Sequence, residues 1–145
     1  MSKRLIVGLM STLLFSGVAM ARDDKLMMSI ENAMGAPDAQ AQLTGDIKFY
    51  FGKNSGPANA KKMGTFSANR KTNAFGKSDE EACNWVFLSA MIALRDRAMK
   101  EGGNAVVDIH SFYKSNPLYN STEFECHAGN IMAGVALRGT VVKLP

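Results

Sequence analysis

One long helix with clear start and stop signals places the strongest limit on how this chain can fold. Ser78 followed by Glu81 is a capping-box pattern, in which each side chain can satisfy a free backbone N–H group at the helix start. Gly102-Gly103 marks the other end, because glycine readily takes the left-handed conformation that follows a helix. The pattern predicts a helix over about residues 79–101. We expect its sheet-facing side to be formed by small and apolar residues: Ala82, Trp85, Val86, Ser89, Ile92 and Ala93.

Segments with strand character lie on both sides of this helix. They combine apolar, β-branched and aromatic residues and are separated by polar or glycine-containing turns: residues 25–30, 46–51, 65–70, 104–112, 122–128 and 131–144. We expect a β-bulge at Gly134 or Gly139 in the last of them. Residues 31–43 predict one or two short helices, the second beginning at Pro37, since proline suits a first helical turn. This order predicts an α+β fold with the main helix packed on an antiparallel-rich sheet.

The first 21 residues have the three parts of a secretory signal peptide. Lys3 and Arg4 precede an apolar run, and Ala19-Met20-Ala21 is an A-x-A cleavage site. The apolar run, residues 5–18, is shorter than the roughly 20 residues that a membrane span needs. We therefore expect cleavage between Ala21 and Arg22, export to the periplasm without a membrane anchor, and a single mature domain over residues 22–145.

The net charge of the mature chain argues against nucleic-acid binding. The leader carries two basic and no acidic residues, so its removal lowers the formal net charge from +4 to +2. Nucleic-acid binders cluster basic residues on one face. The nearest candidates are expected to be solvated residues of a loop-like stretch: Lys53, Lys61, Lys62, Arg70, Lys71 and Lys77.

The two cysteines, Cys83 and Cys126, both lie in the mature part. Two cysteines in an exported chain predict one disulfide. A bridge that closes a loop of about 44 residues would contribute about 4 kcal/mol in the chain-entropy model. The alternative is a pair of free thiols or metal ligands. In that case His110 and His127 are the further candidate ligands, although Cys126 and His127 are adjacent and would point to opposite faces of a strand. No cofactor is expected.

No complete catalytic or nucleotide-binding signature is present. Gly76-Lys77-Ser78 resembles the end of a phosphate loop, but the motif requires glycine at the position of Lys71. Asp108 and His110 lie two residues apart on a predicted strand, with Glu123 or Glu125 expected on the neighbouring strand. We interpret them as a surface polar pair. The sequence therefore predicts that the chain is not an enzyme.

Residues of the second half resemble a set of small exported bacterial proteins that often carry the label of an excinuclease ATPase subunit. The matching stretches are residues 71–83 (KTNAFGKSDEEAC), 103–109 (GNAVVDI), 125–129 (ECHAG) and 132–140 (MAGVALRGT). More distantly, a core of about residues 65–144 is similar to the RcsF envelope-stress sensor and to YbjQ-like domains. The resemblance implies an RcsF/YbjQ-like fold, with a disulfide between the start of the main helix and a later strand at the positions of Cys83 and Cys126.

Three functions remain open from the sequence. The first is a periplasmic binding or accessory domain whose partner is an unknown envelope protein or a small ligand. The second is an RcsF-like module for envelope-stress sensing or protein interaction. The third is a metal- or thiol-dependent site at Cys83, Cys126 and His127.

Overall fold

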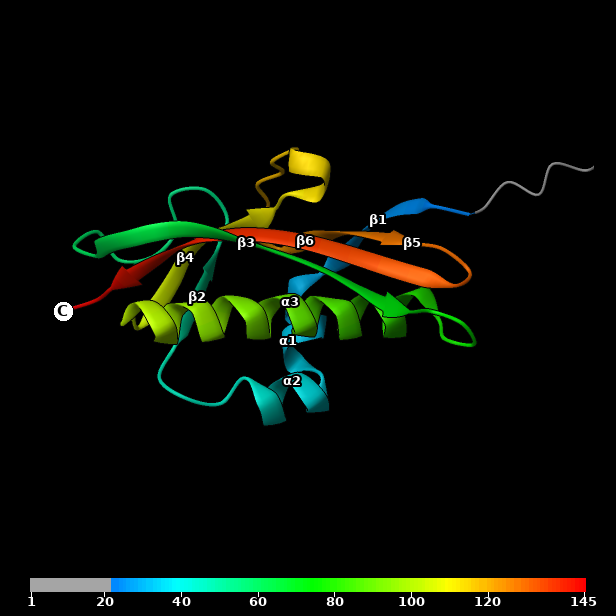
Figure 1. Cartoon of the computed structure of the whole chain (residues 1–145), viewed down its shortest axis with the longest axis horizontal. Coiled ribbons are helices and arrows are strands. Elements are labelled where there is room, and N and C mark those ends of the chain that lie inside the picture. The colour runs from blue at the N-terminus through cyan, green and yellow to red at the C-terminus, as the bar shows by residue number, and fades with distance from the viewer. Residues whose placement is uncertain (1–21) are drawn as a thin grey trace, which may run out of the picture.

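The computed structural model describes residues 22–145, so the predicted signal peptide and its cleavage site at Ala21 lie outside the described residues. The described part is a mixed α and β fold with one curled six-stranded sheet and three α-helices, which agrees with the α+β prediction (Figure 1). Its elements follow one another as β1 Asp24–Ser29, α1 Ile30–Gly35, α2 Pro37–Gln42, β2 Lys48–Phe51, β3 Lys61–Asn73, α3 Asp79–Glu101, β4 Ala105–Ser111, the short 3-10 helix η1 Tyr113–Ser115, β5 Glu123–Ala128 and β6 Met132–Lys143.

Strand β6 is the centre of the sheet. Strand β3 pairs along its whole length on one edge. On the other edge β4 pairs with one half of β6, and β5 pairs with the half that begins at Ala133. Strands β1 and β2 extend the sheet beyond β5 and β4. Every pairing is antiparallel except that of β2 with β4. Because two strands share one edge of β6, the sheet divides there into two arms.

Helix α3 covers one face of this sheet and runs alongside β6 and β3, while α1 and α2 lie on the far side of α3 (Figure 1). Ser78 caps its start by accepting a hydrogen bond from the Glu81 backbone N–H at 3.1 Å, and Gly102, with φ 79°, ends it. The start, end and length of the predicted helix are therefore confirmed. Its buried side is Ala82, Cys83, Val86, Phe87, Leu88, Ala90, Met91, Leu94 and Ala98.

The predicted sheet-facing side of this helix was partly wrong. Trp85 is 45% exposed, and Ser89, Ile92 and Ala93 are only half-buried. The buried stripe follows Cys83, Phe87 and Leu94 instead, so it is rotated away from Trp85. None of the helices within residues 22–145 is both long and apolar enough to cross a membrane.

Two further expectations about the strands need correction. Strand β3 covers thirteen residues and not six, so Lys61, Lys62, Arg70 and Lys71 belong to a strand and not to a loop. The pairing register shifts in β4 between Val107 and His110, in β3 between Lys62 and Gly64 and in β2 between Phe49 and Phe51, and not at Gly134 or Gly139 of β6. Gly139 instead allows a close approach, because a Cβ there would lie 2.6 Å from Val106.

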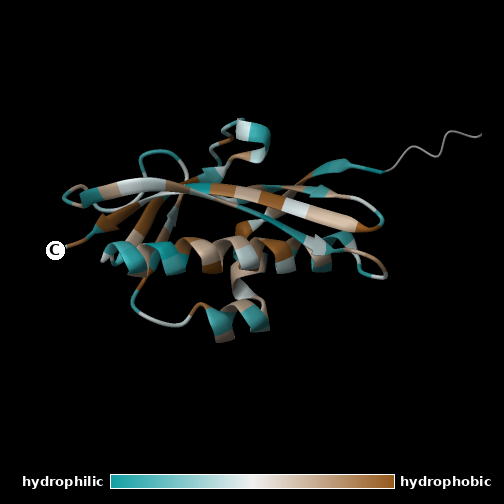
Figure 2. Ribbon diagram, in the orientation of Figure 1, coloured by the Kyte–Doolittle hydropathy of each residue, from teal (hydrophilic) through white to brown (hydrophobic). Residues whose placement is uncertain are grey.

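The outer face of the sheet, opposite α3, is partly covered by the segment around η1 (Figure 1). The hydropathy of the two long strands differs, since β6 is mostly apolar and β3 mostly polar (Figure 2). Strand β6 is paired on both of its edges, whereas β3 is paired with β6 alone and is an edge strand of the sheet. The sheet is therefore apolar at its centre and polar along this border.

Candidate functional site

The structure joins Cys83 of α3 and Cys126 of β5 in a disulfide, as the sequence predicts. The two Cα atoms are 6.0 Å apart, and both residues are fully buried. The bridge therefore ties the first turns of α3 to the sheet from inside the core. Since both sulfur atoms are bonded to each other, neither is a thiolate that could bind a metal or act as a nucleophile in this state.

The four candidate metal ligands do not come together in one site. Cys126 faces α3, whereas the neighbouring His127 lies on the outer face of the sheet. His110 lies on β4, where its ring stacks on Tyr119 with the centroids 4.0 Å apart. Within residues 22–145, no three His, Cys, Asp or Glu side chains are arranged to hold a metal ion.

His127 lines a surface pocket of about 400 Å³ on the outer face of the sheet, which we call the outer-face hollow. It is lined by Arg22, Asp23, Lys71, Tyr113, His127 and residues 129–134. The Tyr113 ring lies over the His127 ring with the centroids 3.5 Å apart and the planes at 11°. His127 Nδ1 is 3.6 Å from Asp23 Oδ1. The hollow is therefore filled in part by the molecule's own aromatic side chain.

A buried carboxylate, Glu125, lies beside His127 at the edge of this hollow. Glu125 is 6% exposed, and its two oxygens lie 3.2 Å from Lys25 Nζ and 3.4 Å from His127 Nε2. His127 Nε2 is buried and is close to this carboxylate without meeting hydrogen-bond geometry. The Glu125 backbone N–H donates to the Ser111 hydroxyl at 2.9 Å, at the point where β4 and β5 diverge. Glu125 therefore joins three neighbouring segments.

Asp108 and His110 do not form the predicted surface pair. Asp108 lies in the β4 bulge with φ 54° and exchanges two hydrogen bonds with Ser55, both 2.8 Å long. His110 Nδ1 lies 2.6 Å from the Asp108 backbone oxygen. The strands next to β4 are β6 and β2, so Glu123 and Glu125 are not on the adjacent strand. Asp108 and His110 therefore hold the β4 bulge and the loop that contains Ser55 in place.

The segment Gly76-Lys77-Ser78 forms a turn and a helix cap. Gly76 has φ 74°, and the Lys77 ammonium donates to the Asn73 backbone oxygen at 2.8 Å. The Ser78 side chain is used by the cap of α3. These three residues therefore form a turn and cap a helix, as expected where the phosphate-loop motif is incomplete.

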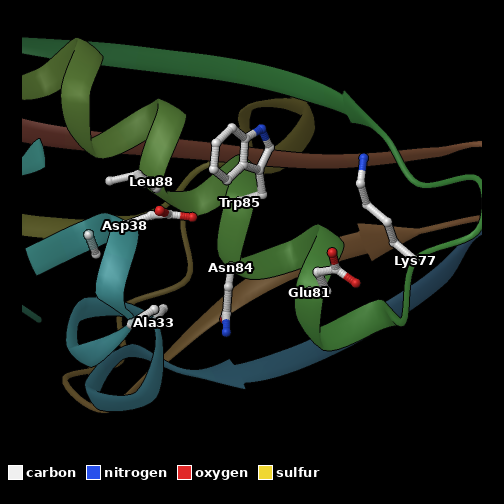
Figure 3. A pocket seen from close by; sticks show the side chains of 9 residues that line it. Ala33, Asp38, Lys77, Glu81, Asn84, Trp85 and Leu88 are labelled. Atoms are coloured by element: carbon white, nitrogen blue, oxygen red, sulfur yellow. The ribbon is translucent and has the colours of Figure 1, made fainter. Parts of the chain in front are cut away.

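A second hollow, which the sequence did not reveal, lies between α1–α2 and the first half of α3. This helix groove has a volume of about 470 Å³ (Figure 3). Its lining is Ala33, Ala36, Asp38, Ala39, Lys77, Glu81, Asn84, Trp85 and Leu88. Alanines and Leu88 supply an apolar floor, and Ala33, Ala39 and Leu88 are each under 5% exposed. The Trp85 ring forms a half-exposed wall.

The charged groups of the helix groove are not neutralised by the protein itself. Asp38 reaches in from α2 and Glu81 from the first turn of α3 (Figure 3). Neither carboxylate is in any of the ion pairs formed within residues 22–145. The Lys77 ammonium is bound to the Asn73 carbonyl and points away from Glu81 (Figure 3). The groove is therefore an apolar hollow with an acidic rim.

A third hollow, of about 600 Å³, lies between residues 43–47 and the second half of α3. Its main cation, Arg95, donates to the Gln42 backbone oxygen and to the Asp96 carboxylate. This side chain therefore holds the loop after α2 against α3.

An ion pair connects the outer-face hollow to the start of α3. The Arg22 guanidinium donates to both carboxylate oxygens of Asp79, at 2.6 and 3.1 Å. These hydrogen bonds raise the pKa of Arg22 and lower the pKa of Asp79. Arg22 also donates to the Gly129 backbone oxygen at 3.2 Å. The pair fixes the entry of β1 beside the β5–β6 turn.

Comparison of the chain with family models, with curated proteins and with solved structures found no match.

Proposed function

We propose that this chain is an exported periplasmic domain without catalytic activity, which binds a partner through the helix groove. The observation that carries the proposal is the combination of a half-exposed Trp85 with two carboxylates that lack an ion-pair partner among the described residues. A well-formed apolar hollow with a few convergent polar groups is the usual place for a binding site. Tryptophan is also among the residues that contribute most to binding free energy.

The disulfide and the leader support the proposed location. A buried bridge between Cys83 and Cys126 suits an oxidising compartment, where such bonds form and persist. The leader, which is cleaved at the A-x-A site before Arg22, would deliver the domain to such a compartment.

A crosslinking experiment in intact cells tests the binding function. A photo-reactive amino acid replaces Asn84 in the groove, and a matched chain carries it at Ser67, an exposed residue of β3 outside the groove. We expect a discrete adduct from position 84 that disappears when Trp85→Ala is added, and no such adduct from position 67. Equal adducts from both positions, or none from position 84, would reject the groove as the binding site.

A second candidate is an RcsF-like module for envelope-stress sensing. The bridge from the start of α3 to β5 favours it, because the resemblance implies a bridge at these positions. RcsF-like domains have a second bridge, and it has no counterpart here because the chain has two cysteines in all. A strain lacking this protein should then show altered output from an envelope-stress reporter. An unchanged response to envelope damage would count against this function.

A further inference from the structure

We propose that the helix groove binds a peptide segment of a partner protein in which an arginine or lysine stands next to apolar side chains. This inference rests on the proposed function and names the chemistry of its ligand. Three features of the groove carry it: the acidic rim, the open face of Trp85 and the apolar floor.

The acidic rim favours a cationic ligand. Asp38 and Glu81 come from different elements and line the same hollow, with no ion-pair partner among residues 22–145 (Figure 3). The one cation in the lining, Lys77, is held by the Asn73 carbonyl. A positive group that enters the groove would meet two carboxylates and one ammonium group, and that ammonium is turned away from Glu81, so the groove attracts cations more than anions (Figure 3).

The face of Trp85 favours a cation held close to an aromatic ring. Tryptophan is the best aromatic partner for arginine or lysine. The protein already uses this contact elsewhere, with Arg97 lying 4.0 Å from the Phe66 ring centroid and Arg138 lying 4.7 Å from that of Phe112. None of the four cation–π contacts found among residues 22–145 involves Trp85. The Trp85 ring can therefore bind a guanidinium group of a ligand, as Phe66 and Phe112 bind those of Arg97 and Arg138.

The strength of such contacts favours a peptide over a free small cation. Exposed ion pairs and exposed cation–π contacts each change an equilibrium constant by only a few-fold. A cation that made only these contacts would bind with a Kd above about 1 mM. Tighter binding needs apolar side chains of the ligand that leave water when they enter the hollow and pack against the half-exposed Trp85 ring. A segment with both kinds of side chain meets this need.

The fluorescence of Trp85 gives a direct test, because Trp85 is the only tryptophan of the chain. The protein is purified from the periplasm with its disulfide intact and titrated with capped peptides. The probe alternates arginine and leucine; the controls alternate glutamate and leucine, or arginine and serine. Arginine amide serves as the free cation. We expect the arginine–leucine peptide to shift the emission with a Kd below about 1 mM at low ionic strength, and the three controls to bind at least roughly fivefold more weakly.

A charge-matched pair of variants locates the effect in the groove. Asp38→Asn with Glu81→Gln removes both rim charges and keeps the side-chain shapes. Glu31→Gln with Glu80→Gln removes two exposed charges of α1 and α3 that do not line the groove. The first pair should weaken binding of the arginine–leucine peptide roughly five- to thirtyfold. The second pair should weaken it less than about twofold, because exposed charges outside the site are screened.

The outcomes separate this inference from the proposed function. The inference is rejected if the glutamate–leucine peptide binds as well as the arginine–leucine peptide, if no peptide shifts the emission, or if the two variant pairs behave alike. Equal binding of arginine amide would reject the peptide in favour of a small cation. In each case an adduct from position 84 would still support a binding groove, whereas its absence would reject the groove itself.

Discussion

The outer-face hollow and the helix groove are similar in size, about 400 and 470 Å³, but differ in how their polar groups are satisfied. In the outer-face hollow, Arg22 pairs with Asp79, and His127 lies between Asp23 and Glu125 under the Tyr113 ring. Two groups there are exceptions: Lys71 at the rim, and His127 Nε2, which is buried without a hydrogen bond to any of residues 22–145. In the helix groove, both carboxylates and the tryptophan face are left open. Volume alone does not distinguish the two hollows, whereas the pairing of charges separates a mostly structural cluster from the proposed binding site.

The disulfide links the two regions, so its removal should have the largest effect on both. Cys83 precedes Asn84 and Trp85 of the groove, and Cys126 lies between Glu125 and His127. Replacing both cysteines by alanine should lower the free energy of unfolding by about 4 kcal/mol, because the unfolded chain regains the freedom of a loop spanning 43 residues. Urea denaturation of the oxidised protein and the double variant measures this loss. A loss below about 1 kcal/mol would contradict the account of the bridge as a main support.

The buried carboxylate of the outer-face hollow should come next. Glu125→Gln removes the charge that lies between Lys25 and His127 and should lower the free energy of unfolding by about 1–3 kcal/mol. Glu123→Gln, on the exposed end of the same strand, should change it by less than about 0.5 kcal/mol. Peptide binding at the groove should be the same in both variants. Equal stability of the two would show that the pairing around His127 is not structural.

The tryptophan of the groove should show the opposite behaviour. Trp85→Ala should lower the free energy of unfolding by only about 1–2 kcal/mol, because about half of the side chain is already exposed. It should weaken binding of a labelled arginine–leucine peptide at least roughly tenfold, as measured by fluorescence anisotropy. Met99→Ala is the control, because Met99 is an exposed apolar residue of the same helix outside the groove. Equal binding by the two variants would remove Trp85 from the site.

The ion pair between Arg22 and Asp79 should have the smallest effect and a defined pH dependence. Its hydrogen bonds lower the pKa of Asp79 in the folded protein, so its contribution is complete above the ordinary carboxyl pKa of about 3.9 and is lost as the pH falls through the lowered value. Asp79→Asn should therefore be slightly less stable at pH 7 and should match the parent protein in strong acid. Glu80→Gln controls for the charge at the helix start. Parallel pH curves for the parent and Asp79→Asn would contradict the pairing.

The sequence predicted those parts of the fold that depend on local signals. The cap at Ser78 and the glycine at 102 fix both ends of α3, and Pro37 begins α2, because caps and proline act within one turn. The disulfide followed from the cysteine count and the leader. The β4 bulge was missed because it depends on Asp108, whose left-handed backbone is held by the distant Ser55.

The helix groove could not be predicted for a related reason. It forms only where α1 and α2 pack against α3, and nothing in the local pattern of either segment encodes that contact. Trp85 was placed toward the sheet because a large apolar side chain usually faces a core. Its position two residues after Cys83 turns it toward the groove once the bridge fixes that cysteine in the core. The signal present in the sequence is a tryptophan two residues after a bridged cysteine on a predicted helix, since that spacing places the two side chains on different sides of the helix.

The most direct test of the binding site is an amide chemical-shift map recorded while the arginine–leucine peptide is added to isotope-labelled protein. Binding in the helix groove should confine the shifts to α1, α2 and the first half of α3 and should include the Trp85 indole N–H. No shift is expected at Tyr113, Glu125 or His127, because these residues lie in or beside the outer-face hollow, on the other face of the sheet. Shifts centred on β5 and η1, with Trp85 unchanged, would contradict the assignment of the binding site.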